Sequence, residues 1–274
     1  MNRPLRALAL LVSAAVLAVA SGATAARADE TVRYRFSDMT VDFGNLHLSV
    51  GLAGYELSSP DGGPVSTIMG AFELTDSFMV HAHLIAPMLG FLGAGESPTR
   101  AEAGISLHST SFAVENEAVE VDRSYSGDYV HTKTMTVPVV NRNSFGLDAG
   151  VMFRRMGVKL DVDDQKVSMR ASHFTAFAGI SSINAAGYRL EAQGYGSFAN
   201  YRWTHGGLDL LFDIAQSYDK DPDDSPSRFG GRLWGETIFG QTIGLSGRLE
   251  IGYMPGGEGF YLMASIGGGL NLGL

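Results

Sequence analysis

Apolar and polar residues alternate along most of the chain after residue 40. The clearest example is the last segment, 260–274, where every even-numbered residue is apolar or glycine. The odd-numbered residues between them include Ser265, Gly267, Gly269 and Asn271. Successive side chains of a strand point to opposite faces, so this segment predicts a strand with one apolar face and one small or polar face. The segments 143–155, 206–217 and 243–254 show the same period.

Turn signals divide the alternating region into twelve candidate strands, which predicts an all-β fold: a transmembrane antiparallel up-and-down β-barrel. An even number of strands fits a barrel with both chain ends on one side of the membrane, and the same turns also allow ten or fourteen strands. The candidates are 46–57, 66–74, 78–86, 104–114, 127–139, 143–155, 172–183, 187–201, 206–217, 229–240, 243–254 and 259–274.

The connections between these strands differ in length from one side of the barrel to the other. If residue 274 is periplasmic, the tight turns at 75–77 and 241–242 are periplasmic as well. The longer segments 86–103 and 217–228 are then extracellular loops. Segments 115–127 and 156–171 do not follow this asymmetry, because they would be long periplasmic connections.

Alternation alone also fits a soluble barrel or sandwich, with its apolar face inward. Three features favour the membrane: the polar face of the last strand is rich in glycine, that strand runs to the final residue, and aromatic residues bracket the strands. Eight to ten residues at ~3.3 Å per residue and a tilt of about 40° span about 20–25 Å, the height of the apolar band of a membrane barrel. The predicted girdle residues are Phe145, Phe153, Tyr188, Phe198, Phe229 and Phe239.

The first 28 residues predict a cleaved secretory signal peptide. Arg3 and Arg6 form the basic n-region, 7–20 form the apolar region, and Ala26-Arg27-Ala28 is a small-x-small cleavage site. The apolar run is shorter than the roughly 20 residues that a membrane-spanning helix needs, which argues against an uncleaved anchor. We therefore expect a periplasmic amino-terminal segment at 29–45 and the barrel at 46–274.

The composition excludes several classes of protein. The chain has no cysteine, so it has no disulfide scaffold, no thiol chemistry and no lipoprotein attachment site. Removing the leader takes away three of the 20 basic residues and no acid, which leaves 17 basic against 29 acidic residues, a net charge of -12. Such an acidic chain is a poor partner for nucleic acid.

The carboxyl-terminal segment resembles the assembly signal of bacterial outer-membrane β-barrel proteins. Its apolar residues fall at alternate positions counted from the end, at Leu274, Leu272, Leu270 and Ile266. It ends in leucine where the commonest form ends in phenylalanine. The resemblance implies an integral protein of the Gram-negative outer membrane, inserted by the barrel assembly machinery and in contact with lipid and lipopolysaccharide. It covers the architecture of residues 40–274 and identifies no subfamily beyond a porin-like barrel.

Ionisable residues of both signs occupy the predicted inner face. In a narrow barrel they would form a salt-bridged core with no open pore, and in a wider one they would line a hydrophilic channel. We expect a narrow, charged passage for small polar solutes. The alternative is a closed-lumen structural or surface-interaction barrel that acts through its extracellular loops. The residues predicted to line the lumen are Asp148, Arg189, Glu191, Asp209, Asp213, Arg232, Glu236, Arg248 and Glu250.

The sequence contains the residue types of a hydrolase, but not in a usable order. His108 and Ser109 are neighbours on one strand, so they face opposite sides and cannot share a proton. We therefore expect no catalytic residues and no enzyme activity. A lipid-modifying barrel enzyme would need a histidine within hydrogen-bond reach of a serine at the lumen rim.

Two further features could hold a metal ion. His81 and His83 lie on one face of a strand, roughly 6.6–7 Å apart, and either share a metal or bond to lumen carboxylates such as Glu73. The acidic stretch 219–224 resembles a calcium loop but has Asp224 in place of the required glycine. We expect no metal and no cofactor, and the sequence leaves the oligomeric state open.

Overall fold

The computed structural model describes residues 34–35, 43–58, 63–87, 99–126, 129–162, 165–192, 196–220, 226–240, 242–256 and 259–272. Ten antiparallel strands, β2 to β11, each pair with the next strand in the sequence, and β11 closes the barrel on β2. In the described ranges no helix is long and apolar enough to cross a membrane. The strands are β2 (Leu46–Ser58), β3 (Gly63–Thr75), β4 (Phe78–Pro87), β5 (Thr99–Ser126), β6 (Tyr129–Val162), β7 (Gln165–Ala192), β8 (Gly196–Tyr218), β9 (Phe229–Phe239), β10 (Ile243–Met254) and β11 (Gly259–Leu272), with a two-residue β1 (Tyr34–Arg35) beside β7.

The barrel has ten strands, which is one of the alternatives that the turns allowed, and not twelve. The candidates 127–139 and 143–155 are both parts of β6, because Asn141 and Asn143 continue the ladder with β5 and do not form a turn. The candidate 187–201 is divided instead, since β7 ends at Ala192 and β8 begins at Gly196. The polar residues that resembled turns lie within strands that continue past the end of the barrel.

The start of β2 and the end of β11 lie at one end of the barrel, which we call the terminal rim, because Leu46 of β2 pairs with Leu272 of β11. The opposite end is the distal rim. The tight connection between β3 and β4 lies at the terminal rim, as expected from residues 75–77. The expectation for 156–171 was wrong: its described residues, 156–162 and 165–171, are paired parts of β6 and β7 at the distal rim, because β6 is one strand. The predicted signal peptide, 1–28, lies outside the described residues. Of the predicted periplasmic segment 29–45, the structure describes 34–35 and 43–45.

The outer surface of the barrel is apolar and the interior is charged. Leu147, Leu210 and Ile243 are 65%, 74% and 77% exposed on the outer face, whereas Asp209 and Glu250 on the inner face are fully buried. A water-soluble barrel has the reverse arrangement. Four predicted girdle residues are exposed on the outer face: Phe145, Phe153, Phe229 and Phe239. Tyr188 instead packs in an apolar cluster beyond the rim, and the side chain of Phe198 lies outside the described residues.

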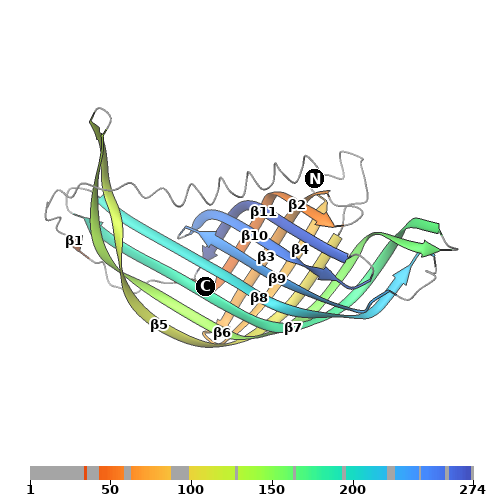
Figure 1. Ribbon diagram of the computed structural model, residues 1–274. Helices are drawn as coiled ribbons and strands as arrows, with labels where there is room; N and C mark the ends of the chain where they lie inside the picture. The colour runs from red at the N-terminus through yellow and green to blue at the C-terminus, as the bar shows by residue number, and fades with distance from the viewer. Residues whose placement is uncertain are drawn as a thin grey trace.

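The strands β5, β6, β7 and β8 are much longer than the other strands (Figure 1). All four continue past the wall at the terminal rim, and β6 and β7 also project beyond the distal rim. At the terminal rim β4 pairs with β5 no further than Leu107, while β5 and β6 stay paired to Ser126 and Tyr129. At ~3.3 Å per residue, the portion 111–126 alone spans about 50 Å. The structure therefore has a long β5–β6 hairpin outside the barrel, at the terminal rim.

Two adjacent glycines on β11 allow the close packing between β11 and β2, where the barrel closes, to be tested. A Cβ atom on Gly267 would lie 1.9 Å from the carbonyl oxygen of Val50 on β2, whereas one on Gly268 would meet only the carbonyl oxygen of Gly244, at 4.0 Å. Gly267→Ala is therefore expected to destabilise the barrel by about 1–3 kcal/mol through steric strain. Gly268→Ala is the matched control and should unfold like the wild type. Urea unfolding in detergent micelles measures both, and equal midpoints would contradict the close approach.

Candidate functional site in the barrel interior

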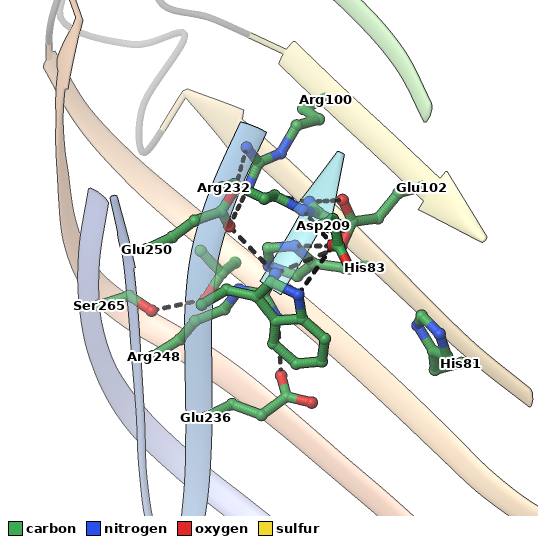
Figure 2. A network of polar contacts seen from close by, with 12 residues as sticks. His81, His83, Arg100, Glu102, Asp209, Arg232, Glu236, Arg248, Glu250 and Ser265 are labelled. Atoms are coloured by element: carbon green, nitrogen blue, oxygen red, sulfur yellow. Dashed lines mark hydrogen bonds and ion pairs between the residues drawn. The ribbon is translucent and has the colours of Figure 1, made fainter. Parts of the chain in front are cut away.

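Three arginines and four carboxylates form a connected layer across the lumen, which we call the charged layer. Period-two spacing places an arginine and a glutamate side by side on two strands, Arg100 with Glu102 on β5 and Arg248 with Glu250 on β10. Figure 2 shows these side chains converging from different strands toward the barrel axis. The other members are Asp209 on β8 and Arg232 and Glu236 on β9.

Glu250 is the centre of the charged layer. It accepts two hydrogen bonds from Arg100, at 2.8 and 2.6 Å, so this pair is bidentate across the lumen. Arg248 donates to the same carboxylate at 3.1 Å, Arg232 lies 3.5 Å from it, and the Tyr261 hydroxyl donates to it. Charge-assisted bonds of this geometry are the strong class of hydrogen bond, and Glu250 is fully buried.

Arg232 links the charged layer to the opposite wall. Its guanidinium donates to Glu102 at 2.5 Å and to Asp209 at 2.7 Å. The indole nitrogen of Trp234 donates to Asp209 at 2.8 Å, and the Arg232 guanidinium lies 4.9 Å from the centre of the Phe177 ring. Each of the three arginines thus pairs with carboxylates, and each guanidinium lies within 6.0 Å of the centre of an aromatic ring.

Histidines extend the polar contacts toward both rims, and five of them each lie beside a carboxylate. None of these contacts is longer than 3.5 Å, and the side chains are buried or nearly so. The pairs are His47 with Glu73, His81 with Asp148, His83 with Glu102, His173 with Asp213 and His205 with Glu236.

Apolar side chains fill the lumen on both sides of the charged layer. Toward the terminal rim lies one buried cluster that contains Met69, Ile183, Trp203 and Ile238. Phe43, which precedes β2 in the chain, packs against it. Toward the distal rim, other buried clusters contain Met152, Leu211 and Met254 together with Phe177 and Tyr261, and Val65, Ile85 and Met263. The charged layer is therefore enclosed by apolar packing at each end.

Seven of the nine residues predicted to line the lumen lie inside the barrel. Arg189 and Glu191 do not: both are exposed on the part of β7 that continues past the terminal rim. They keep the alternation of the strand, so the sequence pattern carries no sign that the barrel wall has ended. The seven interior residues are Asp148, Asp209, Asp213, Arg232, Glu236, Arg248 and Glu250.

Sequence reasoning missed the interior contribution of β5. Arg100 and Glu102 lie in the segment 86–103 that was predicted as an extracellular loop, yet both are buried members of the charged layer. The alternation Arg100-Ala101-Glu102-Ala103 is the signal that could have identified them, because it continues the period of the following strand. Arg142 and Arg154 are also buried and were not predicted to line the lumen. Glu73, expected as a partner of His81 or His83, is buried beside His47 and Arg142 instead.

Two histidines lie close to serines or share a carboxylate with one, so we compared them with a catalytic triad. His108 lies 2.9 Å from the Ser181 hydroxyl, so a histidine–serine pair exists, but both side chains are buried inside the barrel. Asp148 accepts hydrogen bonds from both His81 and Ser106, which places the carboxylate between the base and the hydroxyl. A nucleophile relay needs the histidine in the middle.

His81 bonds to Asp148, whereas His83 lies 3.5 Å from Glu102, so the two histidines have different carboxylate neighbours. In Figure 2 His81 stands apart from the charged layer. In the described part of the chain, no group of three or more histidine and acidic side chains could hold a metal ion. Residues 221–224 of the acidic stretch lie outside the described residues.

No protein-family model matches the chain, and no curated protein shows significant sequence similarity to it.

Proposed function

We propose that the chain is an integral outer-membrane β-barrel with a closed lumen, and that it acts through the segments that project from the membrane. The observation that carries the proposal is the inverted distribution of polarity. Leucine, isoleucine and phenylalanine cover the outer wall while arginines and carboxylates are buried inside. Hydrocarbon around the barrel is the environment that makes this arrangement favourable, and the cleaved leader and the carboxyl-terminal assembly signal would deliver the chain there.

The interior packing favours the closed lumen over the charged passage. An open channel needs charged side chains that keep their hydration, whereas the arginines of the charged layer are each bonded to carboxylates and at most 8% exposed. Buried ion pairs of this kind offset their desolvation only through their mutual contacts, so separating them to admit a solute would be costly. The layer is therefore a structural core, and we assign it no catalytic step, metal or cofactor.

A bilayer measurement tests this function. Folded protein reconstituted in planar bilayers is expected to give no discrete conductance steps, because the charged layer and the apolar clusters block the axis. An open pore-forming protein reconstituted in the same way is the control for insertion. Protease protection of the reconstituted barrel confirms that the silent protein spans the bilayer. Reproducible steps from the wild-type chain would overturn the closed lumen and restore the passage.

A further inference from the structure

At the terminal rim the barrel wall divides into two separate hairpins, and the division leaves a strand edge open. Pairing between β6 and β7 ends at Val140 and Gly187, although β6 continues to Tyr129 and β7 to Ala192. In Figure 1 the β5–β6 hairpin rises away from β7 and β8 on the left. In the described ranges, β6 pairs with β5 from Tyr129 onward, and its ladder with β7 begins only at Val140.

The register identifies which backbone groups lie on this open edge. The amide of His108 on β5 donates to Ser77, away from β6, so Gly146 opposite it also points away from β5. The register runs without a shift from this pair to Glu120 and Thr134. Even-numbered residues of β6 therefore present their N–H and C=O groups to the open side.

Thr134 and Thr136 are accordingly the residues whose backbone can accept a further strand. Both side chains are exposed, so nothing apolar has to be uncovered. Pro138 is also even-numbered and has no N–H, which ends the usable edge before the barrel wall. Exposed edges of this kind pair readily with an extended chain.

The surroundings of the edge define the chemistry of a partner. Beside it lies an apolar cluster in which Met135, Val137 and Leu190 are buried, and alternate side chains of an added strand would extend this cluster. The hairpin 111–140 has five acidic residues against two basic ones. Glu115 and Glu117 are exposed on the same face as Val137.

The molecule already carries one example of such pairing. The short strand β1, Tyr34–Arg35, is seated antiparallel on the neighbouring edge of β7, opposite Glu191 and Ala192. That segment of sequence alternates basic and apolar residues, as Arg33-Tyr34-Arg35-Phe36. At the gap between the two hairpins, the edge of β7 thus already pairs with a strand from a segment of alternating basic and apolar residues.

We propose that the open edge of β6, centred on Thr134 and Thr136, is a docking site for an extended peptide segment of a periplasmic protein, with alternating apolar and basic residues. The peptide adds a strand to the β5–β6 hairpin through main-chain hydrogen bonds, and the acidic side chains select the basic residues. This docking site rests on the proposed function, because it makes the projecting hairpin the working part of a closed barrel.

A synthetic peptide provides the test. Binding of a fluorescent Lys-Val-Arg-Val-Lys-Val-Arg-Val peptide to the folded mature protein in detergent is followed by anisotropy. Thr134→Pro removes an N–H from the open edge and leaves the ladder with β5 intact, so it should weaken binding by about tenfold. Thr134→Val keeps the N–H and should bind like the wild type. Replacing both Glu115 and Glu117 by glutamine should weaken binding and reduce its dependence on salt.

Two results would overturn the docking site. Equal affinity of the Thr134→Pro and wild-type proteins, or equal binding of a Glu-Val-Asp-Val-Glu-Val-Asp-Val peptide, would overturn the docking site. Unchanged gel mobility of the unheated variant shows that Thr134→Pro still folds, and if it does not fold, the acidic peptide and the glutamine variant decide. If the protein gives no conductance and does not bind the peptide, the docking site is rejected and the closed lumen is kept. If the protein conducts, the closed lumen is rejected, with or without peptide binding.

Discussion

Replacing Glu250 by leucine is expected to destabilise the folded barrel by about 3–5 kcal/mol, because the change leaves buried arginine without its partner. Arg100 makes its bidentate contact with this carboxylate, and Arg232, Arg248 and Tyr261 converge on it. Urea unfolding of the protein in detergent micelles, monitored by the mobility of unheated samples in gels, measures the loss.

The double variant Glu250→Leu, Arg100→Leu is the informative companion. It removes both members of the bidentate pair, so it should be more stable than Glu250→Leu alone, since an apolar pair in a buried site is often tolerated. Additive losses from the two substitutions would show that the pair is not energetically coupled, and would contradict the proposed role of the layer.

Glu120→Gln is the matched control, because it breaks an ion pair outside the barrel. Arg123 donates two hydrogen bonds of 2.7 Å to Glu120, and these bonds hold the pKa of the Glu120 carboxyl below its usual value. Both side chains are exposed to solvent, where ion pairs contribute little. The control should therefore unfold like the wild type.

Leu233→Arg is expected to prevent stable insertion of the barrel, at a cost of about 2–4 kcal/mol if the residue lies near the bilayer midplane. Leu233 is 57% exposed on the outer face of β9, and it lies between Phe229 and Phe239, the aromatic residues that mark the two edges of the apolar band. A guanidinium there would face hydrocarbon. The yield of folded protein in lipid vesicles, separated by flotation, measures the effect.

Val114→Arg is the control for that experiment. Val114 is 60% exposed, much like Leu233, but it lies on β5 beyond the terminal rim. Arginine there would face water, so insertion should be unchanged. If both variants insert as the wild type does, the outer face is not in contact with lipid, and the proposed membrane location fails. A loss confined to Leu233→Arg is the pattern that lipid contact requires.

The sequence predicted the fold through period two, and it predicted most of the interior. Along β11 the even-numbered side chains face outward and Tyr261, Met263 and Asn271 are buried inside, as the alternation indicated. The same reasoning placed Asp209, Arg232 and Glu250 in the lumen. Face assignment is local, because adjacent side chains of any strand must point to opposite sides.

Strand number, and with it the state of the lumen, was decided by long-range pairing. The alternation of β6 is the same where it forms the wall and where it runs beyond the rim, so the sequence could not show that Asn141 and Asn143 lie within one strand. Nor could the sequence show that Arg189 lies outside the barrel while Arg100 is buried inside it. Those outcomes depend on where β4 and β9 end beside their neighbours.

By itself, then, the sequence determined the strand period and the separation of apolar and charged residues onto opposite faces, because each follows from the two-residue repeat of a strand. Only the tertiary structure decided that ten strands close the barrel and that Arg100 meets Glu250 across it. It also decided that β6 leaves β7 at Val140 to open an edge. Contacts between residues 150 positions apart depend on barrel radius and register, which no local pattern encodes.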